Sequence, residues 1–66
     1  MYSPYDILRI DADGAIKWMD AAKDLASARD RMADFARRQG GEYVIFYQGT
    51  LEVVERIASP SAIYRA

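Results

Sequence analysis

Neither cysteine nor histidine occurs among the 66 residues of this chain. The lack of cysteine excludes a disulfide framework, and the lack of both residue types excludes an ordinary structural zinc site. The lack of histidine also excludes a Ser-His-Asp triad. A chain this short buries only a modest core, and small domains often gain stability from disulfides, a metal or a partner subunit. Association with a second copy is therefore the extra source of buried surface that we expect.

Long apolar runs and an excess of one charge are also lacking. No stretch approaches the roughly 20 apolar residues that cross a bilayer, and the first residues show neither the basic nor the apolar segment of a secretory signal. The 9 basic and 10 acidic residues leave a net charge of −1, which weighs against broad electrostatic binding of nucleic acid or anionic membrane. We expect a cytoplasmic protein without a membrane partner.

The N-terminal part of the sequence predicts a β-hairpin. Apolar residues alternate with charged ones over residues 5–10, a pattern typical of a strand. Asp13-Gly14 then provides a turn, because glycine accepts the positive φ that a tight hairpin turn requires. Residues 15–19 return as the second strand. The side chains that we expect to face the core are Leu8, Ile10, Ile16 and Trp18.

The spacing of apolar residues then changes and predicts an amphipathic helix over residues 21–39. Apolar residues recur at intervals of three or four, which places them on one side of a helix. They are Leu25, Ala28, Met32 and Phe35. Asp20 is the expected N-cap, because its carboxylate can accept hydrogen bonds from the first free backbone amides. The Gly40-Gly41 pair is expected to end the helix with a left-handed residue.

The C-terminal part of the sequence predicts a second hairpin and a tail. Residues 42–48 form the third strand, and its apolar run is typical of a strand covered on both faces. Residues 51–57 pair back as the fourth strand. Residues 58–66 are expected to be a loop or tail, because Ser-Pro interrupts regular structure. Within this tail, Ile63-Tyr64 is expected to dock as a short cap.

These elements together predict a single α+β domain over residues 1–66. Its fold class is ββαββ, with a single amphipathic helix packed on one face of a four-stranded, mainly antiparallel sheet. The order of the strands stays open, because the second and third strands can be neighbours or can be separated by an outer strand.

The predicted helix leaves one face of the sheet without a cover. A helix of about 20 residues extends about 30 Å and covers only one side, yet both alternating sets of the third strand are apolar. An exposed apolar face of this kind indicates an interaction site, and we expect a symmetric homodimer. The expected interface residues are Tyr43, Ile45, Tyr47, Leu51 and Val53. The alternatives are that the C-terminal tail covers these residues or that the face binds a different partner.

The remaining polar residues predict no catalytic residue, metal site or cofactor. Residues 11–14 resemble the opening of a calcium loop, but the ligands and the glycine required at the later positions are missing. Glu42, Glu52 and Glu55 are expected to be solvated or ion-paired, since an acid–base pair needs a cleft that separates their pKa values. We therefore expect a binding or assembly module and not an enzyme, and we leave open whether it has a small-molecule ligand.

The runner-up function is a small accessory domain that binds nucleic acid. It would use Tyr43 and Tyr47 as stacking platforms on an open sheet, or the arginines of the helix. Those arginines are Arg29, Arg31, Arg37 and Arg38. Neighbouring acidic residues oppose both versions, because they can pair with the arginines at helical spacings and repel phosphate near the tyrosines.

Residues 14–49 are similar to small bacterial ββαββ proteins of unknown function, of the DUF2188 type. The resemblance rests on the tryptophan of the second strand, the alanine-rich helix and the segment Gln-Gly-Gly-Glu-Tyr-Val-Ile that leads into the third strand. The lysines and the second glycine typical of that family's final turn are absent. The resemblance implies the fold and a bacterial source, and it implies no functional residues.

Overall fold

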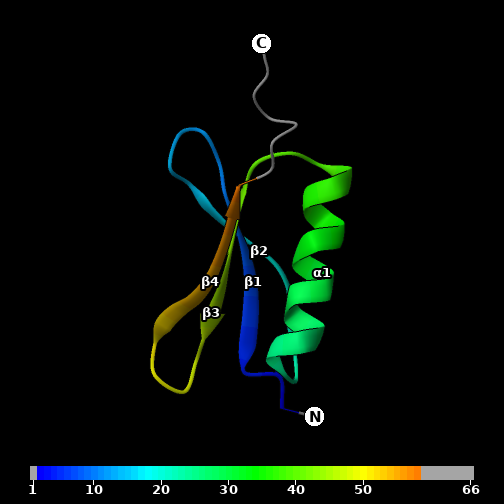
Figure 1. Ribbon diagram of the computed structural model, residues 1–66. Helices are drawn as coiled ribbons and strands as arrows, with labels where there is room; N and C mark the ends of the chain where they lie inside the picture. Colours follow the sequence, from blue (N-terminus) through cyan, green and yellow to red (C-terminus); the bar gives the residue numbers. More distant parts are fainter. Residues whose placement is uncertain (1, 59–66) are drawn as a thin grey trace.

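The computed structural model describes residues 2–58 and shows two β-hairpins joined through one helix (Figure 1). The elements are β1 (Tyr5–Ile10), β2 (Ile16–Ala22), α1 (Leu25–Arg38), β3 (Glu42–Tyr47) and β4 (Glu52–Ala58). The tail expected at residues 58–66 lies outside the described residues except for its first residue, which ends β4. The expected docking of Ile63-Tyr64 is also outside them.

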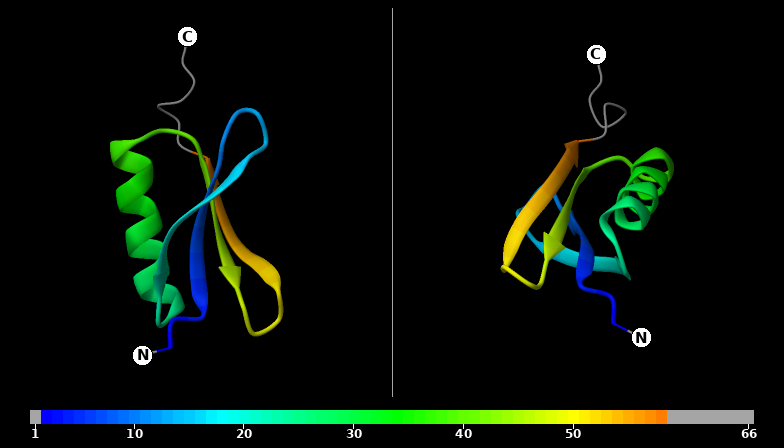
Figure 2. Two further views of the ribbon diagram at one scale, coloured as in Figure 1. Left: turned by 180° about the vertical axis from the view of Figure 1, so that it is seen from behind. Right: turned by 60° about the horizontal axis from the view of Figure 1, so that its bottom comes forward.

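The strands form one antiparallel sheet in the order β2-β1-β3-β4, with α1 on one face (Figure 2). This arrangement confirms the predicted ββαββ fold. It also decides the strand order, because β1 pairs with both β2 and β3. The hairpins therefore meet through their first strands, and β2 and β4 become the edges of the sheet.

The first turn forms as its sequence predicts. The amide of Gly14 donates to the carbonyl of Asp11 at 2.8 Å, and the amide of Asp11 donates to the carbonyl of Ala15 at 2.8 Å. Gly14 has a φ of +89°, so the aspartate–glycine sequence provides the left-handed residue that a three-residue hairpin loop needs.

The helix begins four residues later than expected, because β2 continues through Ala22. Asp24, and not Asp20, is the N-cap, and its carboxylate accepts from the amide of Ser27 at 2.8 Å. Asp20 instead binds the amide of Ala21 and the guanidinium of Arg31. The expected N-cap at Asp20 is wrong because the pairing of β2 with β1 extends as far as Ala22.

The helix also ends differently from the prediction. Its C-cap is Gln39 in an extended conformation, and the positive φ of +139° lies at Gly41. A Cβ at Gly41 would lie 3.1 Å from the Nε of Arg9, so this glycine makes room for the arginine. Arg9 in turn binds the carbonyl of Gly40 and the carboxylate of Asp11, which ties the first turn to the end of the helix.

The hydrophobic core lies between α1 and the sheet. The predicted helical stripe is confirmed, since all of its residues are in the core or pack against it. The buried residues of the core are Ile7, Ala22, Ala28, Met32, Ala36, Tyr43 and Ile45. The ring of Phe35 stacks on that of Tyr43 with centroids 6.4 Å apart, which joins the helix to the middle of the sheet.

The set of side chains expected to face the core in the first hairpin is wrong. Ile7 faces the helix and is buried, whereas Ile16 and Trp18 are exposed on the other face. Leu8 and Ile10 lie on that same face, because alternate residues of a strand point to opposite sides. Both alternating sets of β1 contain apolar residues, so the pattern of this strand did not distinguish its two sides.

Candidate interaction surface

The sheet face opposite α1 is the main apolar surface of residues 2–58. We call it the uncovered face, and its apolar residues come from all four strands. They are Leu8, Ile10, Ile16, Trp18, Val44, Phe46 and Val53, of which Val44 is buried, with 2% exposure. Ile16, Trp18 and Val53 are 66%, 60% and 50% exposed. Its charged residues are Asp6, Glu42 and Arg56.

Trp18 is held in place although it is largely exposed. Its Nε1 donates to Oδ1 of Asp6 at 3.2 Å, and the other oxygen of that carboxylate accepts from Nε2 of Gln48 at 3.0 Å. Asp6 thereby links the edge strand β2 to the turn after β3. An aromatic side chain oriented by a hydrogen bond at its polar atom can present its apolar ring to a partner.

Two of the five residues expected at the interface are core residues. Tyr43 and Ile45 lie under α1 with no exposed surface, and the hydroxyl of Tyr43 donates to the carbonyl of Gln39 at 2.6 Å. The expectation that these two residues line an exposed face is therefore wrong. The helix packs on the odd-numbered residues of β3, so Val44 and Phe46 face the other side.

The other three expected interface residues have separate positions. Tyr47 is half-buried and stacks on Tyr5 with ring centroids 4.8 Å apart. Leu51 is 73% exposed in the turn between β3 and β4. Only Val53 belongs to the uncovered face, where it pairs with Phe46.

The arginines of α1 are engaged in ion pairs. Arg29 binds Glu55 at 3.2 Å, Arg31 binds Asp20 at 2.9 Å, and Arg37 binds Asp34 at 2.6 Å. Arg38 binds the second oxygen of Asp34. These contacts offset most of the positive charge that would otherwise attract phosphate, although Arg37 and Arg38 share one carboxylate.

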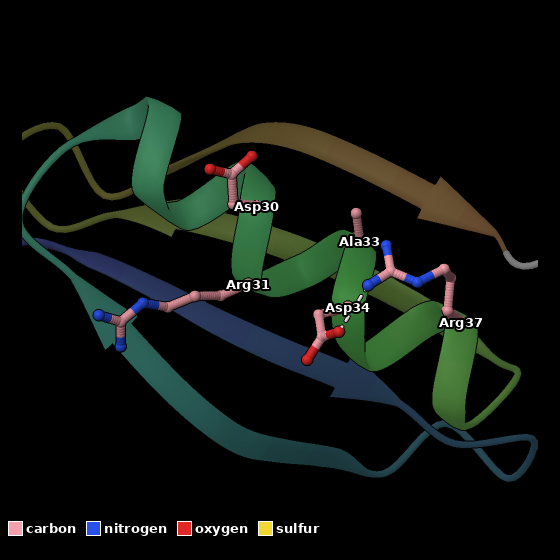
Figure 3. Close-up of a pocket in the computed structure, with 5 residues that line it drawn as sticks. All are labelled: Asp30, Arg31, Ala33, Asp34 and Arg37. Carbon is pink, nitrogen blue, oxygen red and sulfur yellow. Dashed lines mark hydrogen bonds and ion pairs between the residues drawn. The ribbon is translucent and has the colours of Figure 1, made fainter.

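A hollow on the outside of the helix offers no enclosed site. Its lining residues are Asp30, Arg31, Ala33, Asp34 and Arg37, all from α1. Figure 3 shows Arg31 extending away from the others, while Arg37 and Asp34 meet. A site that binds a small ligand is usually concave and formed from several elements, and this surface belongs to a single helix.

Two aspartates have perturbed acidities, and both serve the fold. The backbone amide of Ser27, assisted by its hydroxyl, lowers the pKa of Asp24. The backbone amide of Ala21 is the largest cause that lowers the pKa of Asp20; burial opposes it, and the guanidinium of Arg31 adds to the lowering. Hydrogen bonds to the ionised form explain both shifts. Neither carboxylate belongs to the uncovered face.

Within the described residues, no cluster of carboxylates is arranged to hold a metal ion. The same part of the chain contains no helix long and apolar enough to cross a membrane. No family model, curated protein or solved structure matches the chain. Functional inference therefore depends on the chemistry of its surfaces.

Proposed function

We propose that this protein is a small non-catalytic assembly module that forms a homodimer through the uncovered face. The observation that carries the proposal is the exposure of Ile16, Trp18 and Val53 on one sheet face. Removing such apolar surface from water is favourable. A second copy presents the same surface, so a two-fold symmetric pair covers both faces at once.

The size of the face indicates how tight the dimer is. With strands about 4.8 Å apart and a rise of about 3.3 Å per residue, four strands of about six residues give a face of about 400 Å² per copy. The two copies together would then bury about 800 Å², which is below the area of stable specific interfaces and typical of weak, transient ones. We therefore expect a dissociation constant on the order of 1–100 µM.

The edges of the sheet are less suitable for association. Met19 in β2 and Val54 in β4 are unpaired residues of β-bulges, and both are edge strands. A bulge interrupts the regular row of backbone groups that a further strand would bind. These features favour the face over the edge as the interface.

The charge distribution favours a protein partner over nucleic acid. Arg56 is the sole cation of the uncovered face, and its Nε lies 3.1 Å from Oε2 of Glu42. Asp6 and Glu42 would repel phosphate groups, and single-strand binders normally track the backbone with a positive groove. The proposal places the module in the cytoplasm, because a chain without cysteine suits a reducing compartment.

The proposal is tested by sedimentation equilibrium from micromolar to millimolar concentration, with Val53→Lys and Thr50→Lys as matched variants. Val53 is on the uncovered face, whereas Thr50 is an exposed turn residue. We expect a dimer for the parent and for Thr50→Lys. Val53→Lys should raise the dissociation constant at least about tenfold, because the dimer would bury a charge.

A parent that stays monomeric at millimolar concentration would contradict the proposal, and so would equal behaviour of the two lysine variants. Titration with a single-stranded oligonucleotide at low salt tests the runner-up function. Binding that weakens steeply with added salt would favour nucleic acid as the partner.

A further inference from the structure

One row of side chains across the uncovered face has a self-complementary order. The register of the sheet pairs Trp18 with Leu8, Leu8 with Val44, and Val44 with Arg56. The row therefore has an aromatic ring at the β2 edge, two aliphatic side chains in its centre and a cation at the β4 edge. When the row of a second copy crosses it in the reverse order, each aromatic ring faces a cation and the aliphatic side chains face each other.

We propose that the two copies pack face to face around a two-fold axis parallel to the strands, between β1 and β3. The inference rests on the proposed homodimer and names its arrangement. Rotation about this axis leaves the position of each residue along the strand direction unchanged. It reverses the order of the strands across the sheet. Trp18 of each copy then lies against Arg56 of the partner subunit. Leu8 lies over Val44 of the partner subunit, which is only 2% exposed, so the pairs of Trp18 and Arg56 are the main contacts of this row.

Both end groups are available for this contact. Trp18 is 60% exposed and the Arg56 side chain is 65% exposed. Nε1 of Trp18 donates to Asp6 in the plane of the indole, so the flat face of the ring stays free to stack on a cation. Arg56 forms an ion pair with Glu42 through Nε, and its planar guanidinium is the group that stacks on an aromatic face in a cation–π pair.

The shape of the sheet is consistent with this axis. The sheet is twisted, and both hairpin turns bend away from the helix (Figures 1 and 2). Two sheets with the same twist follow each other's surface when their strands are nearly aligned, as in β-sandwiches. Within this row, the aliphatic pair is then central and the two pairs of Trp18 and Arg56 lie at the rim, where polar groups are usual in protein interfaces.

The other aligned arrangement is opposed by charge. A two-fold axis perpendicular to the strands, through the same row, would place Arg56 against Arg56 of the partner subunit. It would also place Trp18 against its own copy and lose both cation–π contacts. The repulsion of two guanidinium groups distinguishes the two axes.

Because the chain contains no cysteine, thiol cross-linking of introduced cysteines can map the arrangement directly. Packed sheets lie about 10 Å apart, which a disulfide cannot span, so the reagent is a bismaleimide with a spacer of about that length. Ile16 and Ala58 lie in one row at opposite edges of the sheet, through Ile10 and Glu42. In the proposed dimer, Ile16 faces Ala58 of the partner subunit. We expect this reagent to link Ile16→Cys to Ala58→Cys in a mixture of the two variants, and neither variant to cross-link alone.

Lys17→Cys mixed with Ala58→Cys is the matched control, because Lys17 is a neighbour of Ile16 on the opposite face. It should not cross-link. Cross-linking of Ile16→Cys with itself would overturn the arrangement. Failure of the Ile16 and Ala58 pair, in a sample that sediments as a dimer, would overturn it as well.

A second measurement tests the contact between Trp18 and Arg56. Arg56→Gln should raise the dissociation constant about three- to tenfold, because a cation–π contact is lost in each half of the dimer. Arg37→Gln removes the same charge from the outer side of α1 and should leave the constant unchanged. Equal constants for Arg56→Gln and the parent would overturn the contact.

These outcomes separate the two proposals. If the parent does not self-associate, the proposed function fails. If the parent is a dimer but the cysteine variants pair differently, the proposed function stands and only this arrangement fails.

Discussion

At the scale of single residues, Leu51 stands out as a leucine in a left-handed conformation. Its φ is +59° and its side chain is 73% exposed. Its amide donates to the carbonyl of Tyr47 at 2.9 Å, so the turn requires this conformation. A residue with a Cβ atom, asparagine excepted, costs about 1–2 kcal/mol in this left-handed conformation. No buried contact of the leucine side chain compensates for the cost.

Replacing Leu51 with glycine should therefore stabilise the monomer. We expect Leu51→Gly to raise the free energy of unfolding by about 1 kcal/mol, because glycine adopts positive φ without a Cβ clash. Leu51→Ala keeps the Cβ and should give no such gain. Urea unfolding at low micromolar concentration, where the monomer dominates, measures both variants. An equal midpoint for the two would contradict the role of φ.

Trp18 shows how the surroundings of a residue determine its role. In a small domain a lone tryptophan is usually expected in the core, and the sequence prediction placed it there. The bulge at Met19 changes the register after Trp18. Met19 consequently packs against the core, while Trp18 remains on the uncovered face.

At the scale of elements, the N-terminus of α1 depends on one aspartate. Asp24 binds the amide of Ser27, one of the amides that a helix leaves unpaired in its first turn. This hydrogen bond lowers the pKa of Asp24 below its usual value of 3.8. The ionised carboxylate therefore stabilises the helix above that pH, and the contribution is lost as the pH falls through the folded-state pKa.

The acid sensitivity of the fold should be reduced by Asp24→Asn. Asparagine is a good N-cap that does not titrate, so stability near neutral pH should change little. Its decrease between about pH 6 and about pH 2 should be smaller than in the parent. Asp24→Ala removes the cap and should be less stable at every pH. Urea midpoints across this range provide the measurement.

Parallel curves for the parent and Asp24→Asn would contradict this account. Some acid sensitivity should persist in Asp24→Asn, because the amide of Ala21 also lowers the pKa of Asp20. That carboxylate joins β2 to Arg31 of the helix, so it acts through a different contact.

At the scale of the whole molecule, one helix and four strands enclose a thin core. Several of the buried core residues are alanines, and among residues 2–58 Val44 is the one hydrophobic residue that is buried on the face away from α1. Small domains of this size are marginally stable by themselves. Covering the uncovered face with a second copy would add buried surface without lengthening the chain.

The melting temperature should therefore rise with protein concentration. Once the dimer is populated, a tenfold increase in concentration should raise the melting temperature by roughly 3–5 °C. Val53→Lys should show a smaller rise over the same concentrations, because its dimer is at least about tenfold weaker. Circular dichroism melts across two decades of concentration test this. A parent whose midpoint does not depend on concentration would contradict dimerisation.

The predictable part of this structure is local. Asp13-Gly14 and the apolar spacing from Leu25 to Phe35 depend on neighbours within a few residues, and both predictions were confirmed. The start of the helix was wrong because the choice between Asp20 and Asp24 depends on how far β2 pairs with β1. That pairing connects residues distant in the chain.

The candidate surface was harder to predict than the fold. In β3, Tyr43 and Ile45 alternate with Val44 and Phe46, and both sets are apolar. The sequence indicated that one set would lack a cover from the helix but did not say which. Nothing in the alternation of β3 identifies the side on which the helix packs.

The sequence by itself determined the types and order of the elements, the absence of disulfides and the excess of apolar residues over what one helix can cover. Tertiary structure decided that β1 joins the hairpins, that the helix packs on Ile7, Tyr43 and Ile45, and that Trp18 faces away from it. The physical reason is that turns and helices form through contacts between near neighbours. The two sides of an apolar strand become different only when a distant element packs on one of them.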